Sequence, residues 1–451
     1  MFEGTLREFL QYIKENKKKI LCFGTGLMAE EALKHKEIRE AVVCCIDNAA
    51  QKQGKTILLQ GIEYLVIKPE DIMQHFDDKT CLLVTSGYYR DIIYQLNHMT
   101  LPEELEIYSY PHLKVNYASD SWEFFENRIL NECIREYESV LEQNNIFGKQ
   151  REKLVQEKKK FIIGKEGEER PLVLPRVMIM PTTRCNLRCK GCSSLLPMFE
   201  SPADVDISQN IKDLEIFFSA IDECIRITIG GEPFLYPHLK EMLEYLIHQK
   251  KVLGIMLITN STIIPSEDIV DLLKNPKIMV EISDYGHLER MSRLIALFER
   301  QGIIFKVLTE QTWTDMGGVQ CRNRTKEELQ FSYLNCEQSR LMKGIHNGKF
   351  HTCARSARMH GLGAYEAEED YFDLSQGESV DGIRDKIKKL YYSNYAEACN
   401  YCDLGTLPNK IIEAGIQITG NMKKSAYTIV NREEYEHLKQ QATLKESYEK
   451  G

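Results

Sequence analysis

Residues 181–192 read PTTRCNLRCKGC and bring Cys185, Cys189 and Cys192 into one short loop with the spacing Cys-x3-Cys-x2-Cys. Residues 173–180, before the loop, are mostly apolar and predict a buried β-strand. Three thiolates this close together can bind three irons of one cubane cluster. Because a four-iron cluster normally takes four cysteines, the fourth iron would stay open to an outside ligand. A zinc ribbon or a ferredoxin loop is the alternative use of such a triplet.

Apolar strands and helix-forming segments alternate on the C-terminal side of this loop. Further strands are predicted at 225–229, 255–259, 278–282 and 303–308. Parallel strands joined by right-handed helical crossovers form a complete or partial barrel, whose chemistry lies at the carboxyl ends of the strands. We therefore expect an α/β fold with a partial (β/α)6 TIM-like barrel.

Polar and glycine residues follow the ends of two of these strands. Glycines allow a backbone to approach a ligand closely, and a carboxylate suits an ammonium group. Tight turns at strand ends are the alternative explanation. The candidate binding residues are Gly230, Gly231, Glu232, Pro233, Glu281 and Ser283.

The cysteine loop and the Gly-Gly-Glu-Pro motif together resemble the signature of the radical S-adenosylmethionine (SAM) superfamily. The resemblance implies a [4Fe-4S] cluster on Cys185, Cys189 and Cys192, with SAM chelating the open iron. It also implies that an electron from the cluster splits SAM into methionine and a 5'-deoxyadenosyl radical, and that the candidate binding residues hold SAM. Gly191 departs from the family, which usually has an aromatic residue near the adenine at this place.

Four more cysteines, Cys336, Cys353, Cys399 and Cys402, follow the predicted barrel with the spacing Cys-x11-Gly-x4-Cys and then Cys-x2-Cys. Gly348 is expected at the turn of a hairpin. The pattern resembles the twitch subdomain, a shortened relative of the SPASM extension, and implies a second, auxiliary [4Fe-4S] cluster. Four thiolates leave no open iron, so this cluster is expected to transfer electrons. A structural zinc site on the same cysteines is the alternative.

Among twitch enzymes, the pattern is most similar to the 2-deoxy-scyllo-inosamine dehydrogenase family. That resemblance implies oxidation of a carbinol in a sugar or aminocyclitol-like small molecule, with a flavodoxin- or ferredoxin-type electron donor. His351, Arg340 and Tyr285 are candidate bases by position alone. Three alternatives stay open: a sugar epimerase with Cys321 as hydrogen donor, a peptide-modifying maturase, and a zinc-stabilised binding module.

The N-terminal part predicts another parallel sheet, with strands at 19–23, 41–46 and 81–85 and helices at 29–35 and 89–97. Gly24-Thr25-Gly26 follows the first strand, and Asp47 lies 21 positions after Gly26. These features resemble a Rossmann-like, nucleotide-sugar-type domain. Ala29 replaces the third glycine of the fingerprint, and only about 100 residues are present. A docking or scaffold domain without a cofactor is therefore favoured.

The 451 residues are expected to form five parts. They are a Rossmann-like domain (1–116), a helical connector (117–170), the barrel (171–330), the auxiliary cluster domain (331–405) and a C-terminal tail (406–451). The net charge of -9 gives no general attraction to nucleic acid or anionic membranes. No apolar run reaches the roughly 18 residues of a membrane helix, and residues 1–19 do not resemble a signal peptide.

These features predict a cytoplasmic protein without nucleic-acid or membrane partners. Structural disulfides are rare in the cytosol, so the 14 cysteines favour metal centres. Six cysteines in apolar surroundings are instead expected in hydrophobic cores, where cysteine acts as a small apolar residue. They are Cys22, Cys44, Cys45, Cys81, Cys133 and Cys224.

Overall fold

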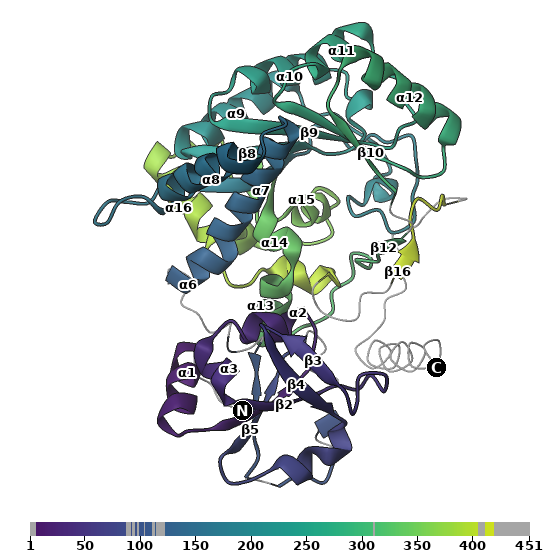
Figure 1. Ribbon diagram of the computed structural model, residues 1–451. Helices are drawn as coiled ribbons and strands as arrows, with labels where there is room; N and C mark the ends of the chain where they lie inside the picture. The colour runs from purple at the N-terminus through teal and green to yellow at the C-terminus, as the bar shows by residue number, and fades with distance from the viewer. Residues whose placement is uncertain are drawn as a thin grey trace. The chain divides into compact units, whose positions relative to one another are not determined.

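Two large β-sheets organise the described part of the chain, one in each of two units (Figure 1). Unit 1 comprises Met1–Ser121, Gln330–Asn335 and Gly405–Pro408, and unit 2 comprises Trp122–Leu329, Cys336–Leu404 and Asn409–Gly451. The computed structural model describes residues 6–86, 92, 95–96, 99–102, 104–110, 113, 122–309, 312–404 and 411–418. Most of the helix predicted at 89–97 and most of the predicted tail lie outside these residues.

The sheet of unit 1 has five parallel strands in the order β4-β2-β1-β5-β6, and β3 pairs antiparallel at the β4 edge. Its strands are β1 (Lys19–Phe23), β2 (Val42–Ile46), β3 (Thr56–Leu59), β4 (Ile62–Ile67), β5 (Thr80–Val84) and β6 (Glu106–Ser109). Apolar residues from β1, β2 and β5 form the core. The strands predicted at 19–23, 41–46 and 81–85 are confirmed to within one residue.

The β3–β4 hairpin was not predicted. Its two-residue turn is Gln60-Gly61, where both residues have a positive φ, as the favoured hairpin turns require. The helix after the glycine loop is shorter than expected. The helices of unit 1 are α1 (Leu6–Glu15), α2 (Leu27–Ala32), α3 (Lys36–Ala41) and the 3-10 helix η1 (Pro69–His75).

The sheet of unit 2 has eight strands in the order β11-β10-β9-β8-β7-β13-β14-β15. They are β7 (Val173–Ile179), β8 (Glu223–Ile229), β9 (Val252–Thr259), β10 (Ile278–Ser283), β11 (Phe305–Leu308), β13 (Met342–His346), β14 (Lys349–His351) and β15 (Tyr371–Asp373). The run from β7 to β11 is parallel, as predicted. The sixth parallel strand, β13, joins the free edge of β7 instead of following β11, so the exact (β/α)6 arrangement is not confirmed.

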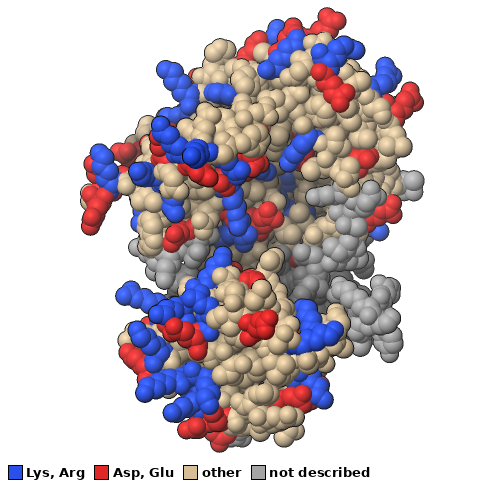
Figure 2. All heavy atoms as spheres, viewed as in Figure 1, with Lys and Arg blue, Asp and Glu red and all other residues tan. Residues whose placement is uncertain are grey.

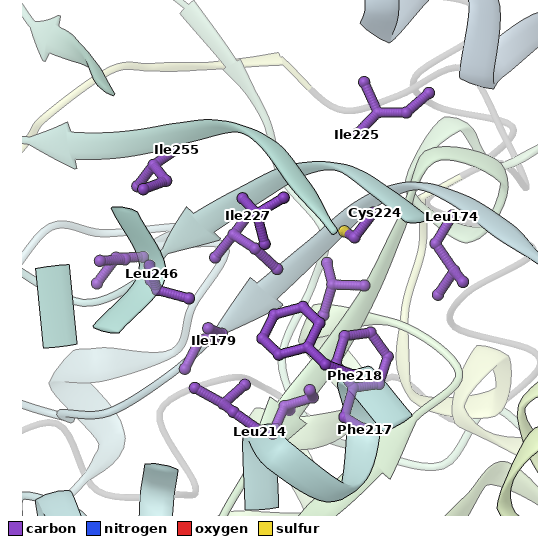
Figure 3. Packing of buried hydrophobic residues seen from close by; sticks show 14 of the residues in the cluster. Leu174, Ile179, Leu214, Phe217, Phe218, Cys224, Ile225, Ile227, Leu246 and Ile255 are labelled. Atoms are coloured by element: carbon purple, nitrogen blue, oxygen red, sulfur yellow. The ribbon is translucent and has the colours of Figure 1, made fainter. Parts of the chain in front are cut away.

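Helices α9 to α12 lie along one face of this sheet, and α15 lies on the opposite face against β13 (Figure 1). Figure 3 shows side chains of β7, β8 and β9 packed with side chains of α9 and α10. The α-helices after the connector are α9 (Ile207–Ala220), α10 (Leu239–His248), α11 (Glu267–Leu273), α12 (Leu288–Gln301), α13 (Lys326–Asn335), α14 (Glu337–Leu341), α15 (Ala354–Gly361) and α16 (Val380–Tyr391). The 3-10 helices are η3 (Leu196–Met198), η4 (Pro233–Leu235), η5 (Glu368–Asp370) and η6 (Glu397–Tyr401).

The predicted connector region is helical and packs in unit 2. It contains α6 (Trp122–Phe125), the π-helical turn η2 (Glu126–Leu130), α7 (Asn131–Gln143) and α8 (Gly148–Ile163). Glu136 of α7 is buried and forms ion pairs with Arg176 of β7 and Arg226 of β8. Removing one member of such a buried network leaves an uncompensated charge, so the network ties α7 to the sheet.

The hairpin β13–β14 turns at Asn347-Gly348, both with positive φ, which confirms the predicted place of Gly348. A separate two-stranded sheet pairs β12 (Thr312–Thr314) with β16 (Ile411–Glu413).

The six cysteines expected in cores are all buried. Lys, Arg, Asp and Glu are interspersed on the face shown in Figure 2. None of the described helices combines the length and apolar character that crossing a bilayer requires.

Candidate functional site

The first cysteine loop, defined by Cys185, Cys189 and Cys192, lies beyond the carboxyl end of β7. Cys189 is buried, and the other two are half-buried. Burial raises the pKa of Cys185 to about 11, and the neighbouring Cys192 thiol adds to the rise. Burial likewise raises the pKa of Cys189, with Cys192 again contributing. Cys192 therefore lies close enough to Cys185 and Cys189 to affect the ionisation of both thiols.

Hydrogen bonds from the segment before α9 fix the start of this loop. The Thr182 hydroxyl donates to Asp204 Oδ1 at 2.7 Å, and Arg184 Nε donates to Asp204 Oδ2 at 2.8 Å. The Thr183 N–H donates to the Ala203 carbonyl at 2.9 Å. The loop thus starts from a fixed point at the strand end, which is the place predicted for the chemistry of a parallel barrel.

Two side-chain amides donate to sulfur atoms of the loop. Asn260 Nδ2 lies 3.6 Å from Cys185 Sγ, and Gln417 Nε2 lies 3.1 Å from Cys189 Sγ. Neither Asn260 nor Gln417 was among the candidate residues predicted from the sequence, and nothing in the local pattern pointed to Gln417. The residue after Asn260, Ser261, is fully buried with φ +63, a left-handed conformation that is uncommon outside glycine.

Arg358 of α15 places a buried positive charge near the loop. Its side chain is 1% exposed, and its Nη2 donates to the Thr182 carbonyl at 3.0 Å. Within the part of the chain that the structure describes, Nε and Nη1 have no hydrogen-bond partner. Burial lowers the pKa of Arg358 to about 10, and the Cys192 thiol acts in the opposite direction. A buried cation with free donors requires an anion, which thiolate ligands of an iron–sulfur cluster provide.

The Gly-Gly-Glu-Pro motif connects β8 to the strands beside it. Both carboxylate oxygens of Glu232 already accept hydrogen bonds, one from Thr259 Oγ1 and one from the Asn260 N–H, each at 2.9 Å. Burial raises the pKa of Glu232 to about 7. A ligand ammonium beside this carboxyl would favour its ionised form.

The glycines of this motif have packing reasons of their own. A Cβ at Gly230 would lie 2.9 Å from Met178 Sδ, and one at Gly231, where φ is +93, would lie 2.9 Å from the Thr182 carbonyl oxygen. Pro233 begins the 3-10 turn η4. The motif therefore stabilises the strand ends.

The two weaker candidates lie on β10. The carboxylate of Glu281 forms an ion pair with Lys306 of β11 at 2.7 Å, so it already has a partner. Ser283 is buried, and its carbonyl accepts a 3.5 Å hydrogen bond from the Ser261 hydroxyl. Both residues lie at the same sheet edge as the first cysteine loop.

The second cysteine set consists of Cys336, Cys353, Cys399 and Cys402. Cys336 and Cys353 occupy the N-cap positions of α14 and α15, and the Cys353 sulfur accepts a hydrogen bond from the Ser356 N–H at 3.3 Å. Burial and the three neighbouring thiols raise the pKa of Cys399 well above its usual value. The fold thus brings together four cysteines from three separate parts of the sequence.

Arginines hold the chain around the last two of these cysteines. Arg324, which is almost fully buried, donates to the carbonyl oxygens of Cys399 and Cys402. Both Arg324 and Arg322 also bind the Asp403 carboxylate. Charge-assisted bonds of this kind are stronger than neutral ones, so they fix the backbone of the loop and leave its sulfur atoms for other ligands.

Zinc and a cluster place different demands on the cysteines. Thiolates on zinc lie about 2.3 Å from the metal and converge on one point, whereas a cubane distributes its cysteines over separate irons. The metal content of the protein distinguishes the two alternatives.

The sequence model of the Radical SAM superfamily matches residues 179–285, which include the first cysteine loop and the Gly-Gly-Glu-Pro motif. The chain contains a radical SAM domain. This domain implies a [4Fe-4S] cluster and SAM as cofactors, and the donors around the first cysteine loop fit them.

The radical SAM domain also has named relatives. The antilisterial bacteriocin subtilosin biosynthesis protein AlbA of Bacillus subtilis (strain 168) is 36% identical over 104 residues. That match covers 23% of this chain, and the chain spans 22%, about a fifth, of the length of AlbA.

Two solved structures are matched over part of this chain, with low TM-scores. BtrN in complex with AdoMet and 2-DOIA is 12% identical with a TM-score of 0.33, covering 55% of this chain and 97% of BtrN. Streptococcus suis SuiB bound to the precursor peptide SuiA is also 12% identical with a TM-score of 0.33, covering 68% and 76% of the two chains.

The three candidate bases lie in different surroundings. Tyr285 is half-buried near the cysteines of the radical SAM domain, which together with burial raise its pKa. Arg340 pairs with Glu132 at 3.3 Å and has a structural role there. His351 is fully buried in β14, and its ring nitrogens have no hydrogen-bond partner among the described residues. Cys321, the thiol of the epimerase alternative, is exposed. These positions do not assign a catalytic base.

Proposed function

We propose that this chain is a radical SAM oxidoreductase that acts on a carbinol of a small carbohydrate-like substrate, such as a sugar or an aminocyclitol. The observation that carries the proposal is the presence of two different cysteine sites in one unit. Three cysteines suit a cluster with an open iron, and four suit a closed cluster that transfers electrons.

When bound, SAM and the two clusters supply a 5'-deoxyadenosyl radical and an acceptor for one electron. Cys185, Cys189 and Cys192 would hold the first cluster, and the second cysteine set would hold the auxiliary cluster. Oxidation of a carbinol to a ketone removes one hydrogen atom, one proton and one further electron. A protein base must therefore accept the hydroxyl proton.

The residues at the strand ends would orient SAM. Glu232 offers a carboxyl for the ammonium group and is itself fixed by Thr259 and the Asn260 N–H. Gly230 and Gly231 allow Met178 and Thr182 to pack closely against the backbone before Glu232. Glu281 and Ser283 lie at the next strand end, where the ribose is expected. This role for Glu281 requires the carboxylate to share its charge with Lys306.

Unit 1 would be a Rossmann-like scaffold or docking domain that does not use a nucleotide. Its parallel strands follow the order of one complete half and part of the other half of that fold. However, the Asp47 carboxylate is bound by Thr25, by Lys52 and by the Ala49 N–H. A Cβ at Gly24 would lie 2.8 Å from the Thr85 carbonyl, which gives this glycine a packing role.

Peptide modification is the second candidate function, because the matched segment of AlbA belongs to a protein named for bacteriocin biosynthesis. It would use the same two cysteine sites on a larger substrate. The proposal for either substrate includes a flavodoxin- or ferredoxin-type electron donor and a cytoplasmic location.

The first experiment tests the cofactors. Anaerobically reconstituted full-length protein should contain about eight irons per chain, and after reduction it should convert SAM to 5'-deoxyadenosine. A chain that binds zinc and no iron would instead be the zinc-stabilised module, and the proposal would be wrong.

The second experiment tests the reaction class in deuterated water, with sugars, aminocyclitols and peptides as substrates. A product that has lost two hydrogens from a carbinol supports the dehydrogenase. A carbon-deuterated epimer would support the epimerase, and a modified peptide would support the maturase. Either of these two outcomes would overturn the proposed substrate oxidation and leave the radical SAM assignment intact.

A further inference from the structure

Residues 411–418 lie against the first cysteine loop, although Gln417 and Cys189 are 228 positions apart in the chain. The Lys190 N–H donates to the Ile416 carbonyl at 2.7 Å, and the Ile418 N–H donates to the Arg188 carbonyl at 2.8 Å. Cys189 and Gln417 thereby form an antiparallel β-bridge. We call residues 411–418 the cover segment.

The orientation of the Gln417 amide follows from its partners. Its Oε1 accepts a hydrogen bond from the Arg188 N–H at 2.7 Å, and a backbone N–H can only donate. The NH2 group must therefore point the other way, where it lies 3.1 Å from Cys189 Sγ. Its second hydrogen bond, to the Gly415 carbonyl, holds it there.

Two glycines allow the cover segment to come this close. A Cβ at Gly191, where φ is +73, would lie 2.1 Å from Ile412 Cδ1. A Cβ at Gly415, where φ is +71, would lie 2.8 Å from Tyr285 Cβ. Tyr285 in turn contacts Trp313 edge to face, with ring centroids 5.2 Å apart, and Trp313 lies in the strand that pairs with β16. Gly191 in the loop thus leaves room for the Ile412 side chain, and Gly415 in the cover segment leaves room for the Tyr285 side chain.

An N–H donor aimed at a cysteine sulfur affects a cluster through its charge. Reduction adds negative charge to the cluster and its thiolates, so a donated hydrogen bond stabilises the reduced form and raises the reduction potential. Asn260 provides a weaker contact of this kind to Cys185, at 3.6 Å. Both of these amide donors, Asn260 and Gln417, are directed at sulfur atoms of the first cysteine loop.

We propose that Gln417 is a positioning residue of the radical SAM site, which raises the reduction potential of the first cluster through its hydrogen bond to Cys189. The inference rests on the proposed cluster at Cys185, Cys189 and Cys192. It assigns a role in the radical SAM chemistry to a segment that lies outside the matched domain.

The test is a redox titration of full-length, anaerobically reconstituted protein, followed by electron paramagnetic resonance. Gln417→Leu removes the donor, and we expect the midpoint potential of the first cluster to fall while that of the second stays unchanged. Gln417→Glu keeps an oxygen for Arg188 and places an anionic oxygen at the sulfur, so its potential should fall further. The midpoint potential of the first cluster should therefore be highest in the unmodified protein, lower in Gln417→Leu and lowest in Gln417→Glu.

Ile416→Ala is the matched control, because Ile416 contributes only its backbone carbonyl to the loop and its side chain is exposed. Its potentials should equal those of the unmodified protein. Equal first-cluster potentials in all four proteins would overturn the inference and leave the proposed function standing. An unmodified protein that forms no cluster would overturn both.

Discussion

The two cysteine sites are supported by different side chains. In the first cysteine loop, the side-chain amides of Asn260 and Gln417 point at sulfur. In the second cysteine set, the buried cation Arg324 binds the backbone carbonyls of the cysteines instead. The first arrangement would act on the charge of the proposed cluster through its sulfur ligands, and the second fixes the backbone of the loop. This difference matches the proposed roles, since only the first cluster has to bind and cleave a cofactor.

The largest effect is expected from Cys192→Ala. It removes one of only three ligands of the first cluster, so formation of 5'-deoxyadenosine should be abolished. Iron should fall from about eight to about four per chain, because the second cysteine set is unchanged. Product analysis by mass spectrometry and iron determination are the two measurements. Undiminished SAM cleavage would show that the first cysteine loop is not the site of the radical chemistry.

Cys399→Ala removes one cysteine of the second cysteine set and leaves the first cysteine loop unchanged. Iron should again fall to about four per chain. SAM cleavage should persist, whereas the two-electron oxidised product should disappear, because the electron acceptor is lost. The ratio of 5'-deoxyadenosine to oxidised product measures this uncoupling. Parallel loss of both products in a folded variant with an intact first cluster would contradict the proposed division of roles.

Arg324→Lys tests whether the loop of the second cysteine set is fixed by its carbonyl contacts. Lysine keeps the charge but cannot reach several acceptors in one plane, so the variant should lose about 2 kcal/mol of stability. Denaturant unfolding of the reconstituted protein measures this loss. Arg135→Lys is the control, because Arg135 is exposed and its one ion pair within the described ranges is with Glu132, a contact of about 0.5 kcal/mol or less. Equal effects of the two substitutions would argue against the fixed loop.

The sequence predicted the parts of the fold that depend on local pattern. Strands β1, β2 and β5 and β7 to β11 are short apolar runs, and they were placed to within three residues. Strand β13 was expected only as one arm of the hairpin at Gly348, and its place beside β7 was missed because it includes Lys343 and His346. Both are buried, and each has a backbone carbonyl as partner, from Ser339 and Met180 respectively. Tertiary contacts thus make a strand from residues that read as polar.

The first cysteine loop could be predicted because its ligands are adjacent in sequence. Its surroundings could not, since Gln417 and Arg358 reach it only through pairings of distant segments. The second cysteine set was predicted from spacing, but its arginine contacts depend on where residues 322–324 return in the fold. Sequence patterns therefore predict the cysteines more readily than the amide and arginine side chains that contact their loops.

The smallest expected effect concerns the support of the second cysteine set by the barrel. Asp213 of α9 is fully buried, and a Cβ at Gly348, the turn of the hairpin that leads to Cys353, would lie 3.3 Å from Asp213 Oδ2. Oδ2 has no hydrogen-bond partner among the described residues, whereas Oδ1 accepts from Gln209 at 2.7 Å. Burial raises the pKa of Asp213 above its usual value of 3.8.

The sign of the pH effect follows from this raised pKa. As pH rises from 3.8 through the raised pKa, the unfolded chain binds fewer protons than the folded chain, so Asp213 lowers stability with increasing pH. Asp213→Asn removes this dependence and should stabilise the protein by about 1 kcal/mol at neutral pH, with a smaller gain in acid. Urea unfolding at several pH values measures the difference. A constant difference across the pH range would mean that Asp213 has the same pKa in the folded and the unfolded chain, and that its burial beside the hairpin turn does not raise that pKa.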